Sequence, residues 1–255
     1  MSPVPQRIVC LSAESADWLW RIGAWENVAG VTAYFAPPPG VGPKPRVSGF
    51  SSANMEQIIR LEPDLVITYS DVQAALAATL VNRGLTVLAT NQRTLAETET
   101  TLAMLARIVN CEIVAEKLLA EFRRRLTPVE NVARRPRVYF EEWNNPLVAG
   151  IGWVGELIER AGGTDVFSSL RTGRGVSERV ITPEQVIQAG PEIIFASWCG
   201  KPMDAAAMTA RPGWKEIAAI RNQQIHELPG DDILQPGFRL VHGFERMKQI
   251  IQSVA

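Results

Sequence analysis

The chain contains little cysteine and little histidine, and neither residue type forms a recognisable motif. Its 255 residues include three cysteines and two histidines, so we expect neither a disulfide framework nor a histidine-rich metal site. Cys10, Cys111 and Cys199 are widely spaced and form no CxxC pair. Unpaired thiols favour a reducing compartment, and Cys10, which lies in an apolar segment, is expected to pack as a small hydrophobic side chain.

The chain also lacks long apolar runs and an excess of charge of either sign. No run approaches the roughly 20 apolar residues that a membrane-spanning helix needs, and residues 1–7 lack the apolar core of a signal peptide. The formal net charge is −1, which argues against a polyanionic partner such as nucleic acid. The sequence therefore predicts no transmembrane segment, and either the mature form of an exported protein or a cytoplasmic protein.

The motifs of common enzyme classes are absent as well. There is no GxSxG, HExxH or GxxxxGK[ST], and the GxG pairs at Gly40 and Gly173 do not follow a strand as a dinucleotide-binding fingerprint does. Glu141 and Glu142 adjoin the end of a predicted strand, which a loop at 142–146 is expected to follow. Adjacent strand side chains point to opposite faces. This disfavours acid–base catalysis by the pair. We predict no catalytic residue, no bound metal and no enzymatic activity.

What the sequence does contain is an internal repeat. Residues 55–67 and 183–195 each show a short amphipathic helix, a proline followed by an acid, and then an apolar run. Proline ends a helix, and such a run is typical of a buried strand. Strands alternate with helices along the chain, which predicts two Rossmann-like α/β halves with mainly parallel sheets. A ligand can bind in the groove between two such halves.

The predicted domain boundaries follow from this repeat. We expect an N-terminal α/β lobe at 1–90, a helical connector at 91–132 and a C-terminal α/β lobe at 133–255. Residues 94–126 contain neither Gly nor Pro, and Asn110 is the expected break between two helices. The second helix, from Cys111 to Leu126, would be more than 20 Å long at about 1.5 Å per residue, which is long enough to bridge the halves.

Aromatic side chains gather where the predicted strands end, in both halves. In open α/β sheets, ligands bind at the carboxyl ends of the strands, and aromatic rings offer broad apolar faces at a low cost in conformational entropy. This distribution favours a large flat ligand. The predicted ligand-binding residues are Tyr34, Phe50, Tyr69, Trp143, Trp153 and Trp198, with Glu142 as a polar neighbour.

Each copy of the repeat also carries an acid near the start of its helix, Glu56 in the first and Glu184 in the second. A first-turn acid interacts favourably with the helix dipole by about 0.3–1 kcal/mol, and this alone accounts for each residue. Their matched positions favour a second role, in which one surface acid of each half contacts a cationic group of a partner.

Together these features resemble the substrate-binding proteins of ABC importers for cobalamin, iron siderophores and haem, the helical-backbone class III. The resemblance covers nearly the whole chain and is carried by residues 7–12, 28–32, 55–67 and 156–163. It implies two α/β lobes joined by a long helix, with the ligand between them. It further implies a periplasmic protein that binds a small molecule for an importer, and we expect a monomer.

Within that family, the chain is most similar to the cobalamin-binding branch, through residues 141–147, 197–200, 211–214 and 234–237. The resemblance implies that the aromatic residues surround a corrinoid, which is a ligand and not a prosthetic group. It also implies that Glu56 and Glu184 contact arginines of the permease. No basic trio typical of a siderophore site stands out; the arginines open to such a role are Arg46, Arg171, Arg174 and Arg179.

Other readings remain open at this point. A haem-binding or iron-siderophore-binding protein is the first, and haem would take Tyr34 or Tyr69 as its axial ligand. Cobalt ligation by His226 or His242 is disfavoured, because a corrinoid with its own lower base needs no histidine.

Members of the family carry an export signal or a lipoprotein anchor. If Met1 is the natural start, a cytoplasmic corrinoid carrier is expected instead. A corrinoid-processing or metal-inserting enzyme that uses Glu141 and Glu142 is the second alternative. An interaction module with an empty groove is the third.

Overall fold

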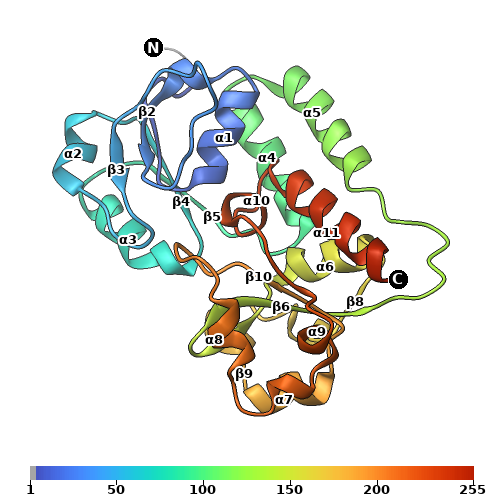
Figure 1. Cartoon of the computed structure of the whole chain (residues 1–255). Coiled ribbons are helices and arrows are strands. Elements are labelled where there is room, and N and C mark those ends of the chain that lie inside the picture. Colours follow the sequence, from blue (N-terminus) through green and yellow to red (C-terminus); the bar gives the residue numbers. More distant parts are fainter. Residues whose placement is uncertain (1–3) are drawn as a thin grey trace. The chain divides into compact units, whose positions relative to one another are not determined.

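The chain forms two compact units (Figure 1). The computed structural model describes residues 4–255. Unit 1 comprises residues up to 92 together with 96–122, and unit 2 comprises 93–95 together with 123–255. Most of the expected connector therefore belongs to unit 1. Within residues 4–255, no helix is both long enough and apolar enough to cross a membrane.

Unit 1 contains a five-stranded, wholly parallel sheet in the order β3-β2-β1-β4-β5. Because all its strands are parallel, their carboxyl ends meet at one edge, which we call the unit 1 edge. The strands are β1 (Ile8–Cys10), β2 (Val28–Thr32), β3 (Arg46–Ser48), β4 (Leu65–Tyr69) and β5 (Val87–Thr90).

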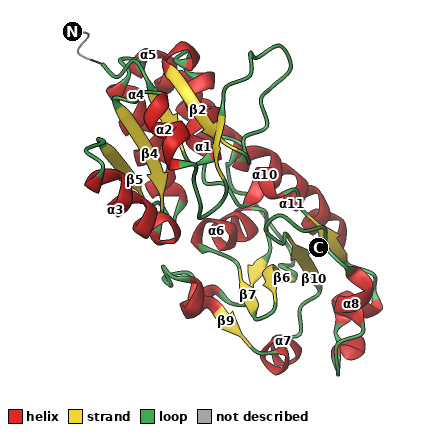
Figure 2. Ribbon diagram, turned by 90° about the vertical axis from the view of Figure 1, so that its left-hand side faces the viewer, coloured by secondary structure: helices red, strands yellow, loops and turns green. Residues whose placement is uncertain are grey.

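Helices flank this sheet (Figure 2). Apolar side chains from α2 and α3, among them Ile58 and Leu80, pack against Val9 and Val66 of the central strands. The fully buried Trp18 of α1 donates its indole N–H to the carbonyl of Leu102 on α4 at 2.7 Å. The helices are α1 (Ala13–Arg21), α2 (Met55–Arg60), α3 (Ala74–Asn82), α4 (Leu95–Ile108) and α5 (Glu112–Arg125), with 3-10 turns η1 (Trp25–Asn27) and η2 (Asp71–Gln73).

The predicted break in the helical segment is confirmed. Asn110 lies between α4 and α5 with a φ of 55°, a left-handed conformation that asparagine tolerates better than most residues. A regular helix cannot continue through such a residue, so the apolar pattern on either side forms two helices.

Unit 2 has a six-stranded sheet in which β11, β10, β6 and β8 are parallel and β7 is antiparallel to both β6 and β9. The strands are β6 (Arg137–Asn144), β7 (Leu147–Ala149), β8 (Thr164–Asp165), β9 (Val180–Ile181), β10 (Ile193–Ala196) and β11 (Ile225–Glu227). The helices are α6 (Gly152–Arg160), α7 (Pro183–Ala189), α8 (Ala205–Thr209), α9 (Ala218–Arg221), α10 (Gly230–Ile233) and α11 (Leu240–Val254), with 3-10 turns η3 (Ser168–Leu170), η4 (Val176–Arg179) and η5 (Trp214–Glu216).

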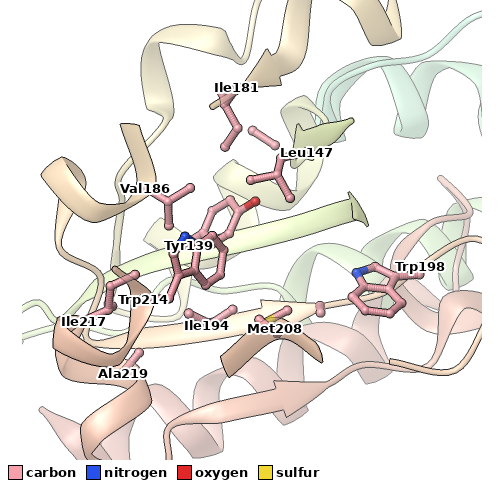
Figure 3. Close-up of a cluster of buried hydrophobic side chains, with 12 residues drawn as sticks. Tyr139, Leu147, Ile181, Val186, Ile194, Trp198, Met208, Trp214, Ile217 and Ala219 are labelled. Carbon is pink, nitrogen blue, oxygen red and sulfur yellow. The ribbon is translucent and has the colours of Figure 1, made fainter. Parts of the chain in front are cut away.

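A buried cluster fills one side of this second sheet (Figure 3). The rings of Tyr139 on β6 and Trp214 on η5 meet edge to face, with their centroids 6.4 Å apart. Met208 and Val186 complete the layer around them, and both are fully buried. The mainly parallel α/β fold expected from the sequence is thus confirmed in each unit.

The internal repeat is present as predicted, with α2 leading to β4 and α7 leading to β10. Both helices begin with a side-chain cap. Asn54 accepts the backbone N–H of Gln57 at 3.0 Å, and Thr182 accepts that of Gln185 at 3.3 Å. Such caps satisfy N–H groups that have no partner inside the helix, which is why two helices this short have defined starts.

One local prediction is wrong. Residues 142–146, expected as a loop, lie mostly in strand: β6 continues to Asn144, and the chain turns at Asn145–Pro146 into β7. The register shifts between Glu141 and Trp143, as it does at a β-bulge. Antiparallel pairing with β7 satisfies the backbone of this polar segment, and that partner is not evident from the local sequence.

Candidate functional site

Three aromatic residues lie at the unit 1 edge. Tyr34 follows β2, Phe50 follows β3 and Tyr69 ends β4. Tyr34 and Phe50 are 45% and 49% exposed, and their rings stand perpendicular with centroids 6.3 Å apart. The structure therefore brings these two predicted residues together. Exposed paired rings present apolar surface, and burying that surface against a ligand would stabilise the complex.

A buried glutamine, which the sequence analysis did not identify, holds this edge together. Gln73 is 5% exposed, and its amide donates to the carbonyls of Leu11 at 3.0 Å and Phe50 at 2.9 Å. Its side-chain oxygen accepts the backbone N–H of Tyr69 at 3.0 Å. Gln73 thus links the segments that follow β1 and β3 to the end of β4, and one side chain helps to position both Phe50 and Tyr69.

The hydroxyl of Tyr69 is engaged, because it donates to the carbonyl of Gln92 at 3.2 Å. Tyr69 is only partly exposed, so it offers less surface than Tyr34 or Phe50. Its ring position nevertheless places a third aromatic group at the same edge of the sheet.

An acid lies buried at this edge as well. Glu14, in the first turn of α1, is 6% exposed, and its Oε1 has no hydrogen-bond partner among residues 4–255. Burial raises the pKa of Glu14 to about 7, against the opposing effect of its hydrogen bonds, because desolvation disfavours the charged form. The Ser48 hydroxyl at the end of β3 is likewise buried without a partner in that part of the chain. Neither residue was predicted from the sequence.

In unit 2, Glu141 is a structural residue. It is fully buried and accepts two hydrogen bonds from the guanidinium of Arg211, at 2.6 and 2.9 Å, one from the indole of Trp198 at 3.0 Å and one from the hydroxyl of Tyr139 at 3.2 Å. Burial, and then the charge of Glu141, raise the pKa of Tyr139 well above its ordinary value. The carboxylate is therefore saturated by partners of the protein itself.

Glu142 is also paired. Its two carboxylate oxygens meet the guanidinium of Arg179 at 2.5 and 3.0 Å, and Arg179 additionally donates to the carbonyl of Ala149 at 2.6 Å. Arg179 is only 2% exposed. Arg171, another arginine considered for siderophore binding, is bonded to Asp165 and Glu159 at 2.9 and 2.6 Å. Neither guanidinium is an unpaired cation in this structure.

The three tryptophans predicted for the site occupy different environments. Trp143 is partly exposed, and its indole donates to the carbonyl of Asn145 at 2.9 Å. Trp153 is 1% exposed and donates to the carbonyl of Ile233 at 2.8 Å, and Trp198 is 5% exposed. Because the rings of Trp153 and Trp198 are enclosed by protein, only Trp143 offers a surface to a ligand.

The two repeat acids lie in matching positions, at the second residue of α2 and of α7. Glu56 and Glu184 are both exposed, and neither has an ion-pair partner within residues 4–255. Hydrogen bonds from its own backbone N–H and from Thr182 lower the pKa of Glu184. Both side chains are therefore available to a partner.

The histidines do not form a metal centre. His226 hydrogen-bonds with Gln224 at 2.9 Å, and burial followed by the charge of Arg246 lowers its pKa. His242 lies 3.5 Å from a guanidinium nitrogen of Arg125. Across the described residues 4–255, no group of three or more His, Cys, Asp or Glu side chains is arranged to hold a metal ion.

Comparison with known proteins agrees with this fold. The model of the periplasmic binding protein family matches residues 8–231. A vitamin B12-binding protein of Vibrio parahaemolyticus is 25% identical over 256 residues, covering 98% of this chain and 90% of the relative.

Solved structures of the same fold include proteins described as binding different ligands. The periplasmic vitamin B12 binding protein of Vibrio cholerae superposes with a TM-score of 0.75 at 22% identity, covering 98% of this chain and 97% of that one. A periplasmic haem-binding protein from Roseiflexus gives a TM-score of 0.79 at 20% identity, covering 97% and 98%. Since the family model spans most of the sequence and the fold agrees throughout, the chain belongs to the periplasmic binding protein family, whose members are substrate-binding proteins of transport systems.

Proposed function

We propose that this chain binds a corrinoid and delivers it to an ABC importer. The observation that carries the proposal is the perpendicular pair of half-exposed rings, Tyr34 and Phe50, at the carboxyl edge of a parallel sheet. Supporting it are relatives that are named as vitamin B12-binding and align over nearly the whole chain. A corrin is a large macrocycle with apolar faces, and aromatic rings bury such faces at low entropic cost.

Each proposed contact has a separate role. Phe50 contributes apolar area alone, and Tyr34 adds a hydroxyl at the unit 1 edge. Tyr69 contributes its ring there, because its hydroxyl is bonded to Gln92. In unit 2, Trp143 contributes a ring. Glu142 acts beside Trp143, where its ion pair with Arg179 fixes the strand that carries the tryptophan. Trp153 and Trp198 are not part of the proposal, because their rings are buried.

We further propose that the protein binds its ligand without transforming it. The one pair of adjacent acids considered for catalysis is fully engaged, Glu141 by four hydrogen bonds and Glu142 by Arg179. A carboxylate held in this way would have to break strong charge-assisted bonds before it could move a proton.

Haem binding is the second candidate, and one observation favours it. Tyr34 is exposed, and a phenolate can serve as an axial ligand of haem iron. A protein of the same fold is described as haem-binding. In this alternative Tyr34, rather than Tyr69, would hold the iron, because the Tyr69 hydroxyl already bonds to Gln92.

The test uses two ligands and one conservative variant. The purified chain is mixed with cyanocobalamin or haemin, passed through gel filtration, and examined for retained absorbance. Tyr34→Phe keeps the ring and removes the hydroxyl. We expect retained corrin absorbance and a Kd for cyanocobalamin that Tyr34→Phe leaves nearly unchanged. Retention of haemin alone, with a Soret shift that disappears in Tyr34→Phe, would overturn the corrinoid assignment.

We also propose that Glu56 and Glu184 contact basic residues of the importer, since both are exposed and equivalently placed on α2 and α7. The double variant Glu56→Gln/Glu184→Gln should retain the Kd for cyanocobalamin and lose corrinoid uptake in cells that carry the importer. Glu116→Gln, which removes an exposed acid on α5, is the matched control. Uptake that survives in the double variant would exclude this role.

A further inference from the structure

A tight turn follows β10 in unit 2 and carries a lysine. The backbone N–H of Lys201 donates to the carbonyl of Trp198 at 3.0 Å, and the two residues form an antiparallel bridge. Gly200 within the turn has a φ of 73°, a conformation that favours glycine. The base of the turn is fixed, because the Trp198 indole is bonded to the buried Glu141 at 3.0 Å.

This turn places a cation against the proposed ligand-binding tryptophan. The ammonium nitrogen of Lys201 lies 4.6 Å from the ring centroid of Trp143, within the range of a cation–π interaction. That interaction uses the negative face of the ring, and the ammonium N–H groups directed away from the ring can still donate to an acceptor.

The charge of Lys201 has no counterpart in the structure. Its side chain is exposed, and no carboxylate lies within ion-pair distance of it among residues 4–255. The arginines nearby differ in this respect, because Arg179 is bonded by both oxygens of Glu142 and Arg211 by both oxygens of Glu141. Lys201 is thus a positioned cation without an acid, directly beside an aromatic ring.

We propose that Lys201 binds an anionic oxygen of the ligand while the ring of Trp143 packs against its apolar part. The inference rests on the proposed function and deepens it by assigning a chemical group. A complete corrinoid carries a phosphodiester in its nucleotide loop, whereas cobinamide lacks that loop. Haem carries carboxylates instead. The shared chemistry is an anionic oxygen that accepts a charge-assisted hydrogen bond from an ammonium group.

The experiment compares two corrinoids on three proteins. The Kd values for cyanocobalamin and dicyanocobinamide are measured by calorimetry at low salt on the full chain, on Lys201→Gln, and on the control Lys215→Gln. Lys215 is an exposed lysine of the same unit on η5. Lys201→Gln should weaken cyanocobalamin binding about five- to tenfold and leave cobinamide binding almost unchanged. Lys215→Gln should change neither, and added salt should reduce the difference.

Each result has a distinct meaning. Equal losses for both corrinoids, or no loss for either, would overturn the anion-binding role of Lys201 and leave the proposed function standing. If the chain binds haemin and not cyanocobalamin, the corrinoid assignment fails. The anion-binding role of Lys201 still holds in that case if the chain prefers haemin to haemin dimethyl ester, which lacks the free carboxylates, and if Lys201→Gln alone abolishes this preference. A chain that binds neither macrocycle would overturn both. Unchanged circular dichroism shows that each variant is folded.

Discussion

Arg211 and Glu141 form a two-bonded ion pair inside unit 2, although they lie 70 residues apart in the sequence. The carboxylate is fully buried, and the guanidinium also lies over the ring of Trp214, 4.4 Å from its centroid. This pair joins β6 to the segment that leads into η5. It therefore supports both the hydrophobic cluster and the base of the turn that carries Lys201.

The first prediction concerns this pair. Glu141→Ala removes the acceptor of four hydrogen bonds and leaves a largely buried guanidinium without its acid, so we expect a loss of about 3–5 kcal/mol in the free energy of unfolding. Urea denaturation measures the loss. The control Glu245→Gln breaks an ion pair with Arg125 whose acid is half exposed, and it should cost less than about 1 kcal/mol. Similar losses in both variants would contradict the assigned role of Glu141.

The second prediction concerns a close backbone approach at the start of α6. A Cβ at Gly152 would lie 2.5 Å from the carbonyl oxygen of Arg93, the same oxygen that accepts the backbone N–H of Trp153 at 3.0 Å. Gly152→Ala should therefore destabilise the protein by about 1–3 kcal/mol. Gly42→Ala, where nothing lies within 4 Å of the added carbon, should be neutral or slightly stabilising. Thermal unfolding of the two variants side by side gives the comparison.

The third prediction is a pH dependence of stability that originates at Glu14. Its pKa rises from an ordinary value of 4.5 to about 7 in the folded protein, so the folded state binds the proton more tightly than the unfolded state. The corresponding stability is fully present below pH 4.5 and is lost as the pH rises to about 7, a change of about 3 kcal/mol.

Glu14→Gln removes this titration, so the measurement is the difference in unfolding free energy between the variant and the unmodified chain across that pH window. Of the neighbouring groups that influence Glu14, Asp17 opposes its ionisation. The Cys10 thiol stays neutral throughout, because burial raises its pKa to about 12. A difference that does not vary between pH 4.5 and 7 would show that Glu14 has an ordinary pKa.

The fourth prediction tests the aromatic pair. Phe50→Ala removes apolar area that the ligand is proposed to bury, and we expect about a tenfold higher Kd for cyanocobalamin. Stability should change little, because Phe50 is 49% exposed. Val81→Ala, which truncates a side chain on α3 that is 57% exposed, should leave the Kd unchanged. Equal affinities of Phe50→Ala and the unmodified chain would remove Phe50 from the site.

The fold was largely predictable because its signals are local. The proline that follows each repeat helix, the apolar run after it and the asparagine between α4 and α5 act within a few residues of where they stand. The strand positions of the two repeats and the break at Asn110 could therefore be located from the sequence, as could the parallel character of the sheets.

Contacts between distant residues could not be predicted from the sequence. The polar segment 142–146 has the composition of a loop, and its pairing with β7 depends on a partner strand that follows the turn. Trp153 and Trp198 lie beside the ends of predicted elements, as Tyr34 and Phe50 do. Their indoles are bonded to Ile233 and Glu141, which lie 80 and 57 residues away. No periodicity distinguishes an aromatic ring that tertiary packing encloses from one that it leaves exposed.

The division of the chain at Gln92 and Arg93 has a consequence for protein engineering. Gln92 accepts the Tyr69 hydroxyl in unit 1, whereas the next residue, Arg93, bonds through its carbonyl to α6 in unit 2. A chimera that exchanges unit 1 between two relatives would need breakpoints after residues 92, 95 and 122, so that residues 93–95 come from the same parent as Gly152. Recombination at the lobe border expected from the sequence, near residue 132, would instead take residues 93–95 from one parent and α6 from the other. The hydrogen bond between Arg93 and α6 would then join segments of different parents.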